Sequence, residues 1–122
     1  KIHGGGNVTI GTTAVSSDKL HVEGTVKSSS TFTGTNFILS SDSRLKQNVE
    51  KAEVSHIDVD WKNFELKSEK GQKRYGVIAQ ELEQKHPEFV RTDDEGMKSV
   101  AYVDLLIAKI AELEARLEKA GL

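Results

Sequence analysis

A serine, an aspartate and a lysine lie close together near residue 41, in a pattern that suits the cutting of a peptide bond. They belong to ILSSDSRLKQNVE, residues 38–50, which joins a Gly-, Ser- and Thr-rich half of the chain to a more charged half. Peptide hydrolysis needs a nucleophile and a base that accepts its proton. A lysine can be that base when desolvation lowers its pKa. Ser41 and Lys46 are therefore candidates for a nucleophile and its base.

The elements around this pair decide whether the two side chains meet. We predict a helix over residues 43–53, because Leu45 and Val49 are four residues apart. In such a helix the side chain of Lys46 leans back toward Ser41, and the free N–H groups of the first turn can stabilise an oxyanion. The spacing equally fits a plainer role, in which Ser41, Asp42 or Ser43 caps the helix and Lys46 is a solvated surface charge.

The composition narrows the class of protein. Only 36% of the 122 residues are hydrophobic, so the chain is poorly equipped to bury an independent core over its whole length. The net charge of -2 gives no bias toward nucleic acid or anionic membranes, and no apolar run approaches the length of a membrane span. There is no cysteine for disulfides or thiol chemistry, and we expect no metal and no cofactor. The chain begins at Lys1, so we expect it to be part of a longer protein.

Residues 1–40 have the pattern of short strands with few large apolar side chains. Leu20, Val22 and Val26 alternate along one possible strand, while Phe32, Phe37 and Leu39 suggest another. Isolated strands of this kind cannot offset their ordering entropy. Two interpretations follow: a disordered linker, or a strand-rich stalk whose core is shared between several chains. The regular spacing of the sparse apolar residues favours the stalk.

The C-terminal half has the pattern of a small α+β unit. We predict strands over residues 57–67 and 72–78, a helix over 77–86 that ends at Pro87, and a hairpin around Asp93–Gly96.

The last segment shows a heptad stripe. Apolar residues recur with spacings of 3, 4, 3, 4 and 3 at Val103, Leu106, Ile110, Leu113, Leu117 and Ala120. The stripe predicts either a coiled-coil seam between chains or an amphipathic helix that packs on its own domain. β-Branched residues at a with Leu at d favour two-stranded parallel coils, which argues against a trimer.

Three segments together carry a family resemblance. SDSRLKQNV (41–49), YGVIAQELEQKHPEFV (75–90) and the heptad helix resemble the C-terminal intramolecular chaperone domain of bacteriophage tailspike, tail-fibre and neck-appendage proteins. That domain is classed as a self-cleaving peptidase and is also found in endosialidase tailspikes. The resemblance covers residues 41–122, and the upstream KLHVEGTVKSSSTF (19–32) is similar to the triple-stranded β-stalk that precedes such domains.

The resemblance implies a fold and a set of partners. It implies an α+β domain with a long coiled-coil-like helix, preceded by an intertwined trimeric β-stalk (triple β-helix). Residues 1–41 would be the end of the stalk, and residues 42–122 the chaperone. The chain would form a homotrimer with its own stalk as folding client, and without nucleic acid or membrane as partner. The stalk would belong to the virion, while the chaperone domain would be released in the host cytoplasm.

The resemblance also implies the site. Family members cut between the motif serine and aspartate, here Ser41 and Asp42, and a serine-lysine dyad maps onto Ser41 and Lys46. Arg44 matches the basic position of the family, with pairing to a carboxylate as its one physical role. The heptad residues Val103, Leu106, Ile110, Leu113 and Leu117 would form the trimer seam.

One chemical difficulty and two rival functions stay open. Attack of the Ser41 hydroxyl on its own carbonyl closes a strained four-membered ring, and attack on the Ser40 carbonyl cuts before Ser41. Ser41 of a neighbouring chain, a water oriented by the serine, or the Asp42 carboxylate would each avoid this.

The first rival function is a permanent, uncut trimerisation and receptor-binding tip of a viral fibre. The second is a membrane-bound transcription factor with the same module, which the lack of a basic DNA-binding segment and of a membrane span disfavours.

Overall fold

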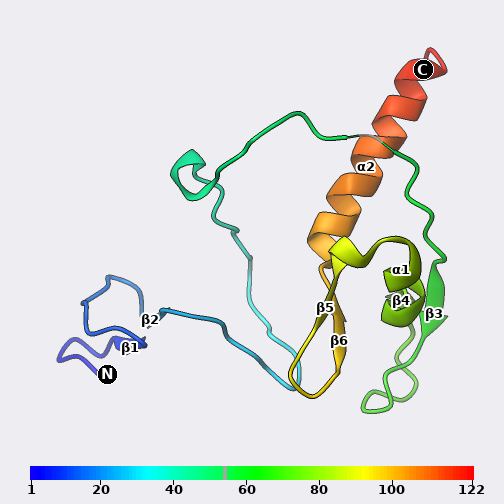
Figure 1. The fold of residues 1–122 in the computed structure, drawn as a ribbon. Coiled ribbons are helices and arrows are strands. Elements are labelled where there is room, and N and C mark those ends of the chain that lie inside the picture. The colour runs from blue at the N-terminus through cyan, green and yellow to red at the C-terminus, as the bar shows by residue number, and fades with distance from the viewer. Residues whose placement is uncertain (54) are drawn as a thin grey trace. The chain divides into compact units, whose positions relative to one another are not determined.

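The computed structural model describes residues 1–53 and 55–122, which form two compact units, Lys1–Gln47 and Asn48–Leu122. In chain order the elements are β1 (Val8–Ile10), β2 (Leu20–Val22), η1 (Ser43–Leu45), β3 (Lys62–Phe64), β4 (Arg74–Gly76), α1 (Ala79–Lys85), η2 (Pro87–Phe89), β5 (Val90–Thr92), β6 (Lys98–Val100) and α2 (Tyr102–Lys119) (Figure 1). The η elements are single 3-10 turns. Short strands and two α-helices make this an α+β chain, as predicted.

The first unit has one small sheet and almost no core. β1 and β2 pair in parallel, with Val8 opposite Leu20 and Ile10 opposite Val22. Of the described residues in this unit, Thr9 alone is buried, and its hydroxyl is bonded to His3 and to the Thr12 carbonyl. A polar residue at the centre contributes little hydrophobic stabilisation. The expectation that this half lacks a core of its own is confirmed.

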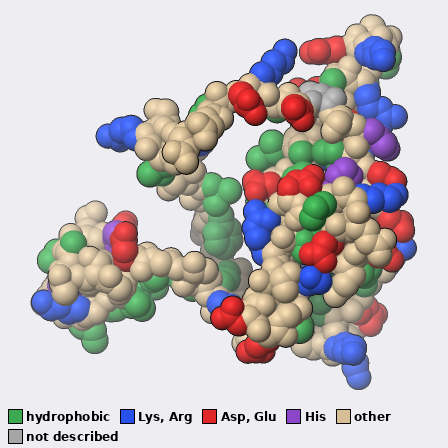
Figure 2. Space-filling model, in the orientation of Figure 1, with side chains coloured by type: hydrophobic (Ala, Val, Ile, Leu, Met, Phe, Trp, Pro, Cys, Tyr) green, Lys and Arg blue, Asp and Glu red, His purple; other side chains and the backbone are tan. Residues whose placement is uncertain are grey.

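Most of the apolar side chains in the first unit face solvent. The exposed set comprises Ile2, Ile10, Val15, Leu20, Val26, Phe32, Phe37, Ile38, Leu39 and Leu45. Figure 2 shows hydrophobic side chains on the visible surface of this unit. The strand predicted around Phe32, Phe37 and Leu39 is absent: residues 23–42 of the described chain contain no strand or helix. A strand needs a neighbouring strand to pair with, and among the described residues no strand pairs with this segment.

The helix predicted over residues 43–53 is also wrong. Only the 3-10 turn η1 forms; Lys46 is already extended, and Asn48 has a positive φ of 53°. Leu45 and Val49, which suggested the helix, are both exposed and therefore provide no packing face. A short helix without such a face is marginal, and the left-handed conformation of Asn48, which asparagine tolerates, is incompatible with a helix over residues 43–53.

The second unit has a hydrophobic core that joins both its helices. The buried apolar side chains are Ile57, Val77, Leu82, Phe89, Val90 and Leu105, with Val59, Ala79, Val100 and Ala108 packed against them. Val77 and Leu82 lie just before and within α1, while Leu105 of α2 is fully buried. The core therefore holds α2 against the rest of the unit.

The predicted elements of the second unit form, with shorter strands than expected. β3 and β4 pair in an antiparallel hairpin over residues 62–64 and 74–76, inside the predicted ranges 57–67 and 72–78. α1 spans 79–85, and Pro87 begins the turn that follows it, as its fixed φ favours. The hairpin around Asp93–Gly96 is confirmed: β5 pairs with β6, and the Asp93 carboxylate accepts hydrogen bonds from the N–H groups of Glu95 and Met97.

Candidate functional site

A tight turn brings the residues on either side of η1 together. Asp42 is the N-cap, and its carboxylate accepts a hydrogen bond of 2.9 Å from the N–H of Arg44. The N–H of Leu45 donates to the Asp42 carbonyl, and the N–H of Lys46 donates to the Ser43 carbonyl. Aspartate favours such local bonds to the following backbone. Asp42 therefore has the capping role that the sequence allowed, but on a single turn.

Ser41 and Lys46 meet across this turn. The Nζ atom of Lys46 lies 2.7 Å from the Oγ atom of Ser41, a normal hydrogen-bond distance, and both residues are exposed. A charged ammonium donates to the hydroxyl oxygen in this contact. A neutral amine reverses the bond and accepts the hydroxyl proton. The same geometry thus suits a resting surface pair and, once the lysine is neutral, a nucleophile with its base.

Asp42 and Arg44 form a second pair on the same turn. The Arg44 guanidinium donates from Nε to one carboxylate oxygen at 3.1 Å and from a terminal nitrogen to the other at 2.8 Å. These side-chain bonds, followed by the backbone N–H of Arg44, lower the pKa of the Asp42 carboxyl. The same carboxylate raises the pKa of the guanidinium. Pairing with a carboxylate was the one role that the sequence suggested for Arg44, and the structure shows which carboxylate it is.

These contacts bear on the groups that could take part in cleavage. The Asp42 carboxylate is engaged on both oxygens, so it is a poorer nucleophile than a free carboxylate. The N–H groups of Arg44 and Leu45, which a helix N-terminus would have offered to an oxyanion, are already bonded to Asp42. Each histidine is engaged elsewhere: His3 with Thr9, His21 with Glu23, His56 with Glu112 and His86 with the N–H of Asp58. Lys46 is thus the base that contacts the Ser41 hydroxyl in the described residues.

The heptad stripe of α2 faces away from the core of its own unit. Its residues Val103, Leu106, Ile110, Leu113 and Leu117 are between 44% and 56% exposed. The residues that pack inward are Leu105, Ala108 and Glu112, which occupy heptad positions c and f, opposite a and d. The helix packs on its own domain, as one of the two interpretations expected, but it does so through a different face from the stripe. The stripe is left free for another partner.

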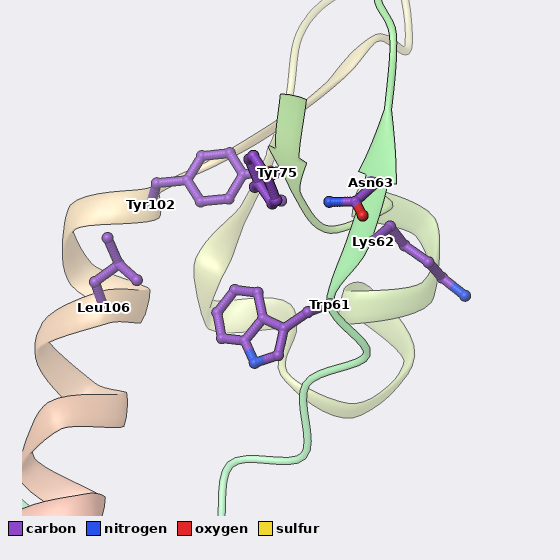
Figure 3. Close-up of a pocket in the computed structure, with 7 residues that line it drawn as sticks. Trp61, Lys62, Asn63, Tyr75, Tyr102 and Leu106 are labelled. Carbon is purple, nitrogen blue, oxygen red and sulfur yellow. The ribbon is translucent and has the colours of Figure 1, made fainter. Parts of the chain in front are cut away.

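An apolar hollow adjoins this stripe. Its volume is about 510 Å³, and its walls include Trp61, Tyr75, Tyr102 and Leu106. Figure 3 shows the Trp61 indole and the Tyr102 ring, which come from opposite sides of the hollow, with Leu106 one turn along α2 from Tyr102. Leu106 belongs to both the hollow and the stripe. The two features therefore make one continuous apolar surface on the second unit.

A buried carboxylate that the sequence did not reveal ties α2 to the segment before β3. Glu112 is 3% exposed, and its oxygens lie 2.7 Å from Lys109 Nζ, 2.8 Å from His56 Nδ1 and 3.7 Å from Arg116. The hydrogen bond from Lys109 is the main reason that the pKa of Glu112 falls to about 2, with His56 and the Ile57 backbone contributing and burial opposing the shift. Lys109 also donates to the Ile57 carbonyl at 2.7 Å. Spacing along the tail helix does not distinguish Glu112 from the other charged residues of the helix, so its burial leaves no sign in the sequence.

The described residues contain no cluster of three or more histidine, cysteine, aspartate or glutamate side chains that could hold a metal ion. Among the same residues, no helix has the length and apolar character needed to cross a membrane.

Comparison with known proteins gives one match. Residues 41–91 match the model of a family described as the chaperone of endosialidase. The matched segment begins at Ser41 and includes Asp42, Arg44 and Lys46, β3, β4 and α1. No curated protein and no solved structure matches the chain.

Proposed function

From the match of residues 41–91 to the family described as the chaperone of endosialidase, we propose that the chain contains a C-terminal intramolecular chaperone domain of a phage tail protein, with a function in two steps. The chain first trimerises and folds the stalk of a phage tailspike, fibre or appendage. It then releases itself by one autoproteolytic cut between Ser41 and Asp42, with Ser41 and Lys46 as a serine-lysine dyad. The observation that carries the second step is the 2.7 Å contact between these two side chains.

The need for a folding partner follows from the first unit. Its many exposed apolar side chains, among them Phe37 and Ile38, lack a covering surface within one chain. Three such chains, each contributing one side chain to a layer, would build a core that none builds alone. Pairing between distant or separate strands is slow and exposes the chains to aggregation. A domain that trimerises first raises the effective concentration of the strands and sets their register.

The surface of the second unit supports this trimerisation. The exposed stripe of α2 and the adjoining hollow form one apolar face on a unit that is otherwise rich in charged side chains. Apolar faces of this kind typically mark interaction sites. In the proposed trimer the stripe packs against the stripes of two neighbouring chains, in the manner of a coiled coil.

The cleavage step needs a route that avoids the four-membered ring. A hydroxyl of Ser41 from a neighbouring chain, or a water held by Ser41, adds to the Ser41 carbonyl carbon, and neutral Lys46 accepts its proton. The bond to the Asp42 nitrogen then breaks, and the protonated lysine gives its proton to the leaving amine. Water hydrolyses any ester formed, which leaves a carboxylate on Ser41 and an amine on Asp42. The paired Asp42 carboxylate is not the nucleophile in this scheme.

Self-release explains why a chaperone is part of the same chain. A trimer whose folding domain has been removed has lost its route back to the unfolded chains, so the stalk becomes kinetically trapped. The stalk (1–41) stays with the virion, and residues 42–122 are set free in the host cytoplasm. The rival function is a permanent trimerisation and receptor-binding tip, for which the same apolar surface suffices and no cut is needed.

Intact-mass measurement on the freshly purified chain tests the proposal. We expect two products whose masses place the cut between Ser41 and Asp42. The variant Ser41→Ala should remain whole and still assemble, whereas the neighbouring Ser40→Ala should cut like the parent. A parent chain that stays whole after assembly favours the permanent tip. A cut between Ser40 and Ser41 would instead show attack on the Ser40 carbonyl.

A further inference from the structure

We infer that Arg44 is a positioning residue for the cut: it occupies the Asp42 carboxylate and thereby leaves Lys46 to the Ser41 hydroxyl. This inference rests on the proposed function, because it assigns a role within the same site. The observation behind it differs from the one that carries the proposed function. It is the pairing of two cations, Arg44 and Lys46, with two acceptors, Asp42 and Ser41, within six consecutive residues.

The turn brings two positively charged side chains near one carboxylate. Lys46 reaches the hydroxyl of Ser41, and Ser41 is the sequence neighbour of Asp42. A flexible lysine that reaches this hydroxyl can also swing to the adjacent carboxylate, where the ion pair is the stronger contact. In the structure it does not do so. The carboxylate is bound by Arg44 through both of its oxygens, and Lys46 is bonded to Ser41.

The chemistry of the two cations explains this distribution. A guanidinium is a planar fork that matches a carboxylate with two parallel bonds, whereas an ammonium is a point charge with rotatable donors. The backbone N–H of Arg44 donates to the same carboxylate, so both the backbone and the side chain of Arg44 hold Asp42 in the turn. Lys46 cannot reproduce this arrangement. The result is one partner for each cation.

The pairing of Arg44 with Asp42 matters for Lys46 because a negative charge near a lysine favours its protonated form. A carboxylate within about 4–6 Å favours the protonated form of a lysine, and a protonated lysine cannot accept the hydroxyl proton. Among the described residues, no other charged side chain makes a hydrogen bond or ion pair with Asp42, Arg44 or Lys46. Arg44 therefore neutralises the carboxylate next to Ser41, which would otherwise favour the protonated, inactive form of Lys46.

The pair adds little to folding, which makes the inference testable. The side chains of Arg44 and Asp42 are 87% and 47% exposed, and exposed ion pairs contribute little to stability. Arg44→Ala should therefore fold and assemble as the parent does. We expect it to cut about tenfold more slowly near neutral pH, with the midpoint of its pH–rate profile about one unit more alkaline.

Two companion variants separate electrostatic from structural effects. Arg44→Lys keeps the positive charge but cannot make two parallel hydrogen bonds to the carboxylate. Its cleavage rate and the midpoint of its pH–rate profile should lie between those of the parent and those of Arg44→Ala. In Asp42→Asn/Arg44→Ala the asparagine can still cap the turn but brings no charge, so the midpoint should return toward that of the parent. Lys51→Ala, which removes an exposed positive charge from the same segment, is the control and should leave the profile unchanged. A slower Arg44→Ala whose midpoint equals that of the parent would overturn the inference and leave only a structural role for the pair.

A readout without cleavage distinguishes failure of this inference from failure of the proposed function. Lysine side-chain NMR on the uncut Ser41→Ala chain follows the titration of Lys46, with Lys46→Arg identifying its signal. If the Asp42 carboxylate is released toward the lysine, adding Arg44→Ala should move the titration midpoint of Lys46 upward. An unmoved midpoint contradicts the inference even if the parent cuts. A moved midpoint together with a slower cut supports it, whereas a parent that proves uncut overturns the proposed function and with it the role of Arg44 in the cut.

Discussion

The Nζ atom of Lys46 lies 2.7 Å from the Oγ atom of Ser41, across a turn that the Asp42 carboxylate closes. If Lys46 is the base of the cut, Lys46→Arg should fold and assemble but remain whole, because arginine keeps the charge and cannot release its proton in this range. The parent should cut faster as pH rises from about 6 to 9, since a lysine must be neutral to act as base. Timed intact-mass measurements on both chains decide this. Equal rates in the two chains, or a rate independent of pH, would return the pair to a surface contact.

The exposed stripe of α2 should hold the trimer together. Leu113→Asp places a charge in the proposed seam and should raise the dissociation constant by on the order of tenfold or more, which is over about 1.4 kcal/mol. Glu118→Ala lies on the same helix, outside the stripe, and is the matched control. Sedimentation equilibrium gives the mass of each assembly. A parent that is monomeric or dimeric in this measurement rejects the trimer.

The stalk should need the chaperone domain to form but not to persist. We expect residues 1–41 to aggregate when made alone, because their apolar side chains lack a partner surface during folding. Stalk released by the cut should resist heat and detergent, because its unfolding is slow. Solubility and native mass of the two preparations test this. Soluble, trimeric stalk made without residues 42–122 would contradict the chaperone function.

A close approach at Gly76 should make that position intolerant of a side chain. A Cβ atom there would overlap the Tyr102 hydroxyl and lie 3.2 Å from the Phe64 ring. Tyr102 cannot retreat freely, because its hydroxyl accepts a hydrogen bond of 3.0 Å from the N–H of Val77. Gly76→Ala should therefore destabilise the second unit by about 1–3 kcal/mol in denaturant unfolding.

The matching control removes only the hydroxyl. Tyr102→Phe loses one hydrogen bond and should cost about 1 kcal/mol. In the double variant Gly76→Ala/Tyr102→Phe the closest contact is gone, so its cost should be smaller than the sum of the two single costs. Additive costs would show that the hydroxyl is not what excludes a side chain at position 76.

The buried Glu112 should make the stability of the second unit depend on pH under acid conditions. Its pKa is about 2 in the folded chain, against an ordinary value of 4.5. A carboxyl whose pKa is lower in the folded state adds stability that is fully present above 4.5 and is lost as pH falls from there through about 2. The melting temperature of the parent should fall over this pH window.

Glu112→Gln tests the assignment. The variant should be less stable than the parent near neutral pH, since Lys109 loses its counter-charge, and its melting temperature should depend less on pH under acid conditions. If the melting temperature of Glu112→Gln falls with pH as much as that of the parent, other carboxylates are responsible for the acid dependence.

The features that the sequence predicted well are those set by near neighbours. The contact between Ser41 and Lys46 was predictable because all members of the Ser-Asp-x-Arg-x-Lys stretch lie within six residues, so that one turn brings the two side chains together. The same holds for the hairpin around Asp93–Gly96 and for the helix of the tail. Periodicity and turn residues are local signals, and these elements depend mainly on local backbone preferences.

Tertiary contacts decided the rest. The pair Leu45 and Val49 suggested a helix, but neither side chain has a surface to pack against, and the chain leaves the helical conformation after one turn. The stripe of α2 was evident in the sequence, yet which face meets the core depended on where Ile57, Val77 and Phe89 lie in space. Glu112 appears as one more surface charge until the fold brings His56, 56 residues away, against it. Spacing along the chain reports only on neighbours within a few turns, whereas burial and ion pairing depend on segments that folding brings together from a distance.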